Sequence, residues 1–261
     1  MYKGKYFFIM TERREAIRKF IESRGEVTIS ELAENFSGWS EMTLRRDLAF
    51  LEKAGFIILT RGGARRIPYR YGMLEDIYSE REQRNHEEKQ TIAAKAAALV
   101  EPGKGIYIDC GTTAMAFARE VPDCNLVVIT SAPNIALDII MRKEKPSVFM
   151  LGGTLSRKEI AVSDPEVPAQ LEKLNIETAF MTASAYDPKY GFTVGTQTGA
   201  IFKRAVIKRA KKVVMMLDSS KSCGLLPFTF AMPEDVNVLV TDGKLEPEIS
   251  AELEQRIALV L

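Results

Sequence analysis

The feature that most constrains the fold of this sequence is an alternation of short apolar segments with amphipathic ones, which runs from Glu87 to the end of the chain. Six apolar segments have the length and the β-branched content of buried strands: 105–109, 126–130, 147–151, 178–182, 213–217 and 236–241. Segments with apolar residues at helical spacing stand before, between and after them: 89–100, 113–119, 134–141, 200–210 and 249–257. This alternation predicts an α/β domain with a mostly parallel sheet that helices cover on both faces.

The residues ahead of this domain show a different pattern, of short helices followed by a hairpin. Apolar residues recur at helical spacing within 11–23, and Gly25 follows as a stop signal. Thr28 and Glu31 stand three apart, which is the spacing of a capping box, and they predict a short second helix. Ser40 can cap a third helix, whose expected inward residues are Met42, Leu44, Leu48 and Leu51.

The third helix and the hairpin after it carry the chemistry of a DNA-binding surface. Two short helices joined by a turn at Gly38, with arginines on the exposed face of the second, are typical of a helix-turn-helix. A guanidinium suits this task because its fork binds guanine O6 and N7, or a phosphate, through two hydrogen bonds. The apolar run 56–59 and the Gly62-Gly63 turn predict a hairpin with a basic tip that would contact phosphates. The candidate DNA-binding residues are Ser40, Glu41, Thr43, Arg45, Arg46, Arg61, Arg65 and Arg66.

The alternative for the third helix is a solvated surface on which Arg45 and Arg46 pair with Glu41 or Asp47. The basic hairpin beside that helix favours DNA binding over this alternative, because it adds the phosphate contacts that set register on a duplex. Trp39, in the turn before the helix, is expected to fill the core of the turn rather than to stack on a base.

Charge is distributed unevenly along the chain, although the net charge is only +1. Residues 1–70 hold 14 Lys and Arg against 9 Asp and Glu, an excess of +5, whereas the remainder holds 22 against 26, an excess of −4. A basic N-terminal part is expected to meet a polyanion, and the alternative for so small an excess is a solvated basic face. Residues 69–86 are charged and rich in tyrosine, without a clean apolar period, which predicts a linker with some helix. We therefore divide the chain into a DNA-binding domain at 1–68, a linker at 69–86 and an α/β effector-sensing domain at 87–261.

The composition argues against several classes of protein. No run of 18 apolar residues is present, and the apolar N-terminal stretch is too short for a signal peptide before Arg13 and Arg14, so we expect a cytoplasmic protein with no membrane partner. The three cysteines lack the spacing of metal ligands, and the single histidine, His86, stands among charged residues. We expect no metal, no cofactor and no disulfide framework.

Polar residues follow four of the predicted strands, and together they predict an anion-binding pocket. The first strand runs into Asp109-Cys110-Gly111-Thr112-Thr113 and then a helix, which offers backbone amides and hydroxyls to an anionic group. Three other strands are followed by Ser131, by Gly152-Gly153, and by Asp218 with Lys221. Ligands of open α/β sheets bind outside the carboxyl ends of the strands, so these loops are expected to converge. The alternatives are a common βα turn at Gly111 and an ordinary surface ion pair between Asp218 and Lys221.

The motifs of the N-terminal part resemble the DNA-binding signature of the DeoR family of bacterial repressors. The resemblance rests on the order and spacing of Thr28-Ile-Ser-Glu-Leu-Ala-Glu-Asn-Phe, Ser40-Glu-Met-Thr-Leu-Arg-Arg-Asp-Leu, Leu51-Glu-Lys-Ala-Gly and Arg61-Gly-Gly-Ala. The α/β part is similar to the sensor domain of that family through the strand-end loops and through Glu88-Lys89-Gln-Thr-Ile-Ala, Tyr190-Gly191-Phe-Thr and Val240-Thr-Asp242. The resemblance covers residues 11 to 245 or so.

This resemblance implies a sensor domain similar in fold to phosphosugar isomerases and CoA transferases, with phosphorylated sugars or related catabolic intermediates as effectors. Carried over residue by residue, it implies effector contacts at Asp109, Gly111, Thr112, Thr113, Gly152, Gly153, Asp218 and Lys221, and also at Lys89 and Lys203. Ser131 joins this set from its place after the second strand.

Two functions of different classes compete. The first is a repressor that binds operator DNA as a homo-oligomer, a dimer or a tetramer, and that a phosphorylated sugar controls. The second is an enzyme, a sugar-phosphate isomerase or CoA transferase with an appended DNA-binding domain. Isomerisation needs a base, for which Asp109 or Asp218 could serve, but no paired acid and base is identifiable. Cys110 is expected to be a packed thiol, because no activating base is indicated near it. We therefore expect a repressor without catalytic residues.

Overall fold

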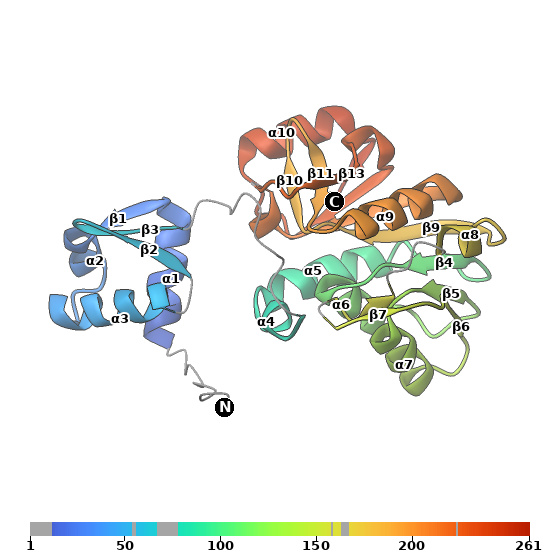
Figure 1. Ribbon diagram of the computed structural model, residues 1–261, viewed down its shortest axis with the longest axis horizontal. Coiled ribbons are helices and arrows are strands. Elements are labelled where there is room, and N and C mark those ends of the chain that lie inside the picture. Colours follow the sequence, from blue (N-terminus) through green and yellow to red (C-terminus); the bar gives the residue numbers. More distant parts are fainter. Residues whose placement is uncertain (1–11, 54–55, 67–77, 158, 163–166, 223) are drawn as a thin grey trace. The chain divides into compact units, whose positions relative to one another are not determined.

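The computed structural model describes residues 12–53, 56–66, 78–157, 159–162, 167–222 and 224–261, and Figure 1 shows how their elements are arranged. The chain separates into two compact units, Met1–Arg70 and Tyr71–Leu261. The first unit has one hydrophobic core, and the second has a core on each face of its main sheet. The domain boundaries at residues 68 and 86 remain a prediction.

The first unit is a winged helix-turn-helix. Its helices are α1 (Glu12–Arg24), α2 (Ile29–Asn35) and α3 (Glu41–Lys53). An antiparallel sheet in the order β1-β3-β2 contains β1 (Glu26–Thr28), β2 (Ile57–Thr60) and β3 (Gly63–Arg66). The three helices and the sheet bury one core, which includes Ile17, Ile21, Leu32, Leu44, Leu48, Leu51 and Ile57.

Local sequence explains the start of α2 and the turn of the wing. The amide of Glu31 donates to Thr28 Oγ1, and the amide of Thr28 donates to Glu31 Oε2, so the predicted capping box is confirmed. In the wing, Gly63 pairs with Thr28, and a Cβ at Gly63 would lie 2.0 Å from the carbonyl oxygen of Val27. Glycine at this position therefore allows β3 to approach β1.

Arg13 and Arg14 of α1 hold a buried carboxylate on α3. Asp47 is 1% exposed, and its oxygens lie 2.5 Å from Arg13 Nε and 2.7 Å from Arg14 Nε. Burial raises the pKa of Asp47, but hydrogen bonds and charges from both arginines outweigh it, so the pKa lies below its ordinary value. The ionised Asp47 thus joins α1 to α3.

Two side chains near the start of α3 differ from the prediction. Met42 is 65% exposed rather than inward, because the buried face of the helix follows the spacing of Leu44, Leu48 and Leu51. Trp39 does not fill the core, since it is 38% exposed and stacks on Phe36 with ring centroids 5.8 Å apart.

The second unit is built on a parallel sheet, with seven strands in the described part of the chain, in the order β15-β14-β12-β9-β4-β5-β6. These strands are β4 (Gly105–Ile108), β5 (Val127–Thr130), β6 (Ser147–Met150), β9 (Ile176–Thr182), β12 (Ala210–Leu217), β14 (Val238–Thr241) and β15 (Leu259–Val260). The larger helices are α5 (His86–Ala97), α6 (Thr112–Glu120), α7 (Pro133–Arg142), α9 (Gln197–Arg209) and α10 (Pro247–Arg256). The predicted α/β fold with a mostly parallel sheet is confirmed.

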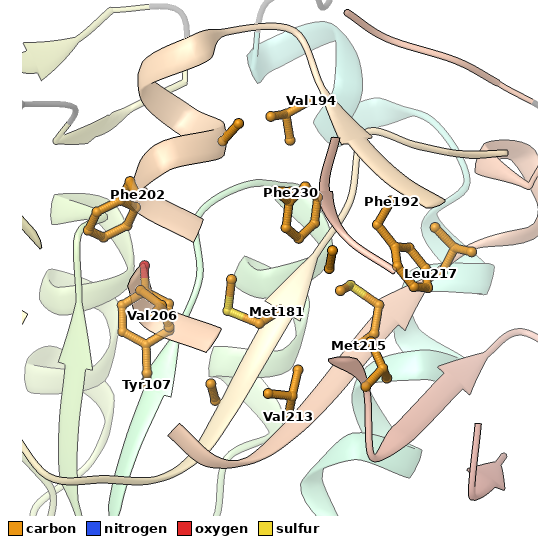
Figure 2. Close-up of a cluster of buried hydrophobic side chains, with 14 of the residues drawn as sticks. Tyr107, Met181, Phe192, Val194, Phe202, Val206, Val213, Met215, Leu217 and Phe230 are labelled. Atoms are coloured by element: carbon orange, nitrogen blue, oxygen red, sulfur yellow. The ribbon is translucent and has the colours of Figure 1, made fainter. Parts of the chain in front are cut away.

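Successive residues of the inner strands β4, β5, β9, β12 and β14 enter different cores, one on each face of the sheet. Tyr107 and Met181 pack in the core with α9, whereas Ile108 and Phe180 pack in the core with α5 and α6. Figure 2 shows Tyr107 beside Phe202 of α9, and their ring centroids are 6.2 Å apart. Burial on both faces explains why these strands read as nearly continuous apolar runs.

The structure adds short elements that the sequence did not predict. They are the short strands β1 and β15, a hairpin of β7 (Leu155–Ser156) and β8 (Ala161–Val162), an antiparallel sheet of β10 (Ala185–Asp187), β11 (Gly191–Val194) and β13 (Phe228–Ala231), helix α8 (Val167–Leu171), and 3-10 turns η1 (Ser219–Lys221) and η2 (Pro233–Asp235). Helix α4 (Tyr78–Gln83) agrees with the helix expected within the linker, and it packs near α6.

Replacing Asp47 with Ala should lower the free energy of unfolding of the winged unit by about 1–3 kcal/mol, because both arginines lose a buried acceptor. Glu41→Ala is the control: it removes an exposed partner 3.7 Å from Arg45 and should change that free energy by less than about 0.5 kcal/mol. Calorimetric unfolding of the full chain measures both variants. Equal effects would contradict the role given to Asp47.

Candidate DNA-binding surface and effector pocket

The outward face of α3 carries the predicted DNA-binding residues of that helix. Ser40 precedes the helix, and its Oγ lies 3.1 Å from Thr43 Oγ1 and 3.4 Å from the Thr43 amide nitrogen. The side chains of Ser40, Glu41, Arg45 and Arg46 are exposed, and Thr43 is half-buried. This placement leaves the face accessible to a duplex.

The ion pairs of this unit bear on the alternative of a merely solvated helix. Arg45 Nη2 lies 3.7 Å from Glu41 Oε2, and both side chains are more than half exposed, which makes the pair weak. Asp47, the other acid considered as a partner, is engaged by Arg13 and Arg14. The structure therefore shows no strong competitor for Arg45 among the described residues.

The wing adds basic side chains after α3. Arg61 lies in the turn between β2 and β3 and is exposed, as is Arg65 on β3. The side chain of Arg66 lies outside the described residues. Exposed guanidinium groups on a hairpin are suited to phosphate contacts.

A pocket in the second unit lies at the carboxyl ends of β4, β5 and β9. Its polar lining comes from several loops and α9: Arg81, Asp109, Cys110, Ser131, Glu159, Thr182, Ser184, Thr196 and Lys203. Three of the predicted effector-binding residues, Asp109, Ser131 and Lys203, belong to this lining. Sequence reasoning missed Arg81, because it lies in the predicted linker, and Thr182, because only the fold places it beside Asp109.

A buried ion pair lies in this pocket. Asp109 is 0% exposed, and its Oδ2 accepts hydrogen bonds from the amide and the hydroxyl of Thr182, both at 2.9 Å, and from Lys203 Nζ. Lys203 also donates to the carbonyl oxygen of Thr182 at 3.0 Å. Asp109 Oδ1 is buried and has no hydrogen-bond partner among the described residues. A buried acceptor without a donor lowers the stability of the fold by about 1–3 kcal/mol. This oxygen is therefore suited to accept a hydrogen bond from a ligand hydroxyl.

The chain turns from β4 into α6 through Gly111. Its φ of 102° falls in the region that favours glycine. Thr112 is buried and Thr113 is half-buried in the first turn of α6, where backbone amides lack intrahelical acceptors. Gly111, Thr112 and Thr113 are not in the pocket lining, although they follow Asp109 and Cys110, which are.

A second polar cluster lies where β12 ends. Asp218 is buried rather than on the surface, and its Oδ1 accepts hydrogen bonds from Asn85 Nδ2 and from the Ser220 amide, both at 3.2 Å. Lys221 is half-buried in η1. Lys89 is buried, and its ammonium donates to the carbonyl oxygens of Arg81 and Arg84. Lys89, Asp218 and Lys221 lie outside the lining of the pocket around Asp109.

The Gly152-Gly153 pair also lies outside that lining. Both glycines are exposed after β6, which is an edge strand. The amide of Gly152 donates to Gln170 Oε1, and the side-chain amide of Gln170 donates to the carbonyl oxygen of Gly152, both at 3.1 Å. In the described structure this loop therefore bonds to Gln170.

Cys110 lines the pocket with a half-buried thiol. Burial, assisted by the charge of Asp109, raises the pKa of Cys110 to about 12. A thiol with this pKa keeps its proton at neutral pH and is a poor nucleophile.

The described residues contain no group of three His, Cys, Asp or Glu side chains that could hold a metal ion. No helix in that part of the chain has the length and apolar character needed to cross a membrane.

Comparison with known proteins identifies both units. Residues 13–69 match the DeoR-like helix-turn-helix domain, and residues 84–243 match the DeoR C terminal sensor domain. The chain is 33% identical over 249 residues to the uncharacterized HTH-type transcriptional regulator YulB of Bacillus subtilis, covering 95% of each chain. It is 31% identical to the HTH-type transcriptional regulator GlpR of Haloferax volcanii, covering 93% of this chain and 94% of that one.

Another relative is the lactose phosphotransferase system repressor of Streptococcus mutans, with 32% identity over 88% of this chain and 91% of that one. Among solved structures, ribose 5-phosphate isomerase A from Methanocaldococcus jannaschii matches with a TM-score of 0.39 and 21% identity, covering 53% of this chain and 55% of that chain. The two domain matches and the full-length relatives agree, and the chain belongs to the DeoR family of DNA-binding transcriptional regulators.

Proposed function

We propose that this regulator is a cytoplasmic repressor of sugar-catabolism genes and that a phosphorylated sugar controls its binding to operator DNA. One observation carries the choice of effector: Asp109 Oδ1 is buried without a partner in a pocket that also holds Lys203 and Arg81. A sugar hydroxyl would donate to this oxygen, and the cations would attract a phosphate. The name of the relative from Streptococcus mutans supports the sugar-related repressor role.

The proposal gives the pocket a binding role without catalytic turnover. Lys203 and Thr182 hold one oxygen of Asp109, the other oxygen is assigned to a ligand hydroxyl, and the Cys110 thiol keeps its proton. Ribose 5-phosphate isomerase assays on the full chain test this choice against the enzyme alternative. Turnover above background that disappears in Asp109→Asn would favour the enzyme.

Arg45 and Arg46 are proposed to read the operator and Arg61 and Arg65 to contact its phosphates, with Ser40, Glu41, Thr43 and Arg66 beside them. Arg45→Ala or Arg46→Ala should weaken binding to a duplex selected from a random library by about 1–3 kcal/mol, because each would lose a base contact. Arg61→Ala should weaken binding to all duplexes alike and reduce the salt dependence.

Fluorescence anisotropy at fixed salt measures these affinities. Lys208→Ala, which removes an exposed cation from the sensor unit, is the control for net charge. An Arg45→Ala, Arg46→Ala double variant that binds the selected duplex like the control would contradict this assignment.

A phosphorylated sugar, and not the free sugar, should release the protein from the selected duplex. The probes are glucose 6-phosphate, fructose 1-phosphate and ribose 5-phosphate, each beside its unphosphorylated sugar. A ligand at 100 times its Kd should also stabilise the sensor unit by about 2.7 kcal/mol in a thermal-shift assay. Release by the free sugars at equal concentrations would contradict the phosphate requirement.

Lys221 is proposed to help bind the effector, together with Asp218 and the first turn of α6. Lys221→Ala should raise the effector concentration needed for release while leaving DNA affinity without effector unchanged. Lys211→Ala is the matched control, because Lys211 is exposed near the start of β12 and pairs with Glu177 at 2.9 Å. Equal effector responses of the two variants would remove Lys221 from the proposed site.

We further propose that the protein is a homo-oligomer, since paired winged units read paired half-sites. An apolar surface on α7, beside the edge strand β6, is suited to bind a second copy of the sensor unit. It consists of Leu137, Ile140 and Met141 on α7, exposed by 62%, 57% and 82%, with Met150 on β6, which lies on the same face of the sheet as Val148 in the core beneath α7. An edge strand that pairs with its own copy gives a closed two-fold dimer.

Leu137→Lys with Met141→Lys should therefore lower the mass measured by light scattering from that of an oligomer toward that of one chain. Ile201→Lys, which places a charge on an exposed apolar residue of α9, should not change the mass. A wild-type monomer at micromolar concentration would contradict the oligomer, and an unchanged mass in the double variant would contradict this surface.

A further inference from the structure

Helix α4 is the first described element after the wing strand β3, and it belongs to the sensor unit. Contacts with distant parts of that unit hold both of its ends. At the start, the side-chain amide of Asn134 donates to the Tyr78 hydroxyl at 3.0 Å. After the end, Asn85 adopts φ 51° and donates to Asp218 Oδ1 at 3.2 Å and to Ser220 Oγ at 2.8 Å. The position of α4 therefore depends on α7 and on the end of β12.

A buried cation holds the backbone of the same segment. Lys89 is 6% exposed, and its ammonium donates to the carbonyl oxygens of Arg81 and Arg84, both at 2.5 Å. Burial lowers the pKa of Lys89 to about 8, which reflects the cost of keeping a cation there. Two of its three donors serve the backbone of this segment, so the structure gives Lys89 a positioning role.

The side chain of Arg81 connects α4 to the pocket. It lines the pocket together with Asp109, Lys203 and Thr196. A methyl group at Gly111 would lie 3.9 Å from Arg81 Nη1, so the guanidinium reaches the loop between β4 and α6. A guanidinium binds two oxygens of one phosphate in a planar fork.

The other charged residues of the pocket, Lys203, Asp109 and Glu159, determine how much Arg81 contributes to phosphate binding. Lys203 is engaged with Asp109 and with the carbonyl oxygen of Thr182. Glu159, between β7 and β8, also lines the pocket. A phosphate that binds Arg81 must tolerate this carboxylate, and removing the charge of Glu159 should tighten binding.

We propose that Arg81 binds the phosphate of the effector and that α4, positioned by Lys89, carries the effect of binding toward the DNA-binding unit. This inference rests on the proposed function, because it names the phosphate contact and the coupling element of the same pocket. Helix α4, which follows the DNA-binding unit in sequence, would then contact the ligand directly through Arg81.

The first test measures binding by isothermal titration of the full chain with inorganic phosphate and the three sugar phosphates. Arg81→Met should weaken sugar phosphate binding about tenfold to a hundredfold, the loss expected for a charge-assisted contact. Glu159→Gln should tighten it. Arg84→Met is the matched control, since the Arg84 carbonyl also accepts from Lys89 but its side chain is not in the pocket lining, and it should bind like wild type.

The second test separates positioning from binding. Lys89→Met should raise the sugar phosphate concentration that releases the selected duplex at least tenfold more than it raises the Kd, because α4 loses its anchor. Lys89→Arg, which keeps the donors, should restore part of the coupling. Amide exchange of peptides within 78–89 should slow on ligand binding in wild type and remain unchanged in Arg81→Met.

Each result bears on one part of the account. If Arg81→Met binds the sugar phosphates like Arg84→Met, the phosphate contact is overturned while the proposed function stands. If Lys89→Met raises the sugar phosphate concentration needed for release and the Kd for the sugar phosphate by the same factor, α4 is not the coupling element. If none of the sugar phosphates binds the wild-type chain, the proposed effector class fails and this inference fails with it.

Discussion

The pair formed by Asp109 and Lys203 is the interaction on which the sensor unit depends. An isolated buried carboxylate is costly, and here Lys203 and the amide and hydroxyl of Thr182 satisfy one of its oxygens. These contacts join the end of β4, the end of β9 and α9 at one point. The same arrangement leaves Oδ1 without a partner among the described residues, so the group that fixes the packing is also the one proposed to accept a hydrogen bond from the effector.

In the DNA-binding unit, the charged groups that hold α3 in place differ from those proposed to contact DNA. On the buried side of α3, Asp47 is fully engaged by Arg13 and Arg14. On the other side, Arg45 has only a weak exposed pair with Glu41. Since the acid that anchors α3 lies away from the exposed arginines, the helix can be held in the unit without neutralising the face proposed to contact DNA.

Features that depend on apolar periodicity or on neighbouring residues could be predicted from the sequence. The strands of the parallel sheet are buried on both faces, and the capping box of Thr28 and Glu31 is a local signal, so both were predictable. Helix α4 has only six residues, and its position depends on distant contacts such as Tyr78 with Asn134. Its segment therefore read as a linker with some helix, without a defined position, and Arg81 was missed. Gly152 resembled the other strand ends, but in the structure it bonds to Gln170.

In the proposed mechanism, effector binding and DNA binding oppose each other within one chain. Linkage requires that coupling to be reciprocal, so the effector and the operator must weaken each other by the same factor. The direct measurement is the Kd of the releasing sugar phosphate, by isothermal titration, with and without saturating selected duplex. We expect the duplex to raise the Kd for the sugar phosphate, and the sugar phosphate to raise the Kd for the duplex by the same factor. An effector Kd that is unchanged by the duplex would contradict it.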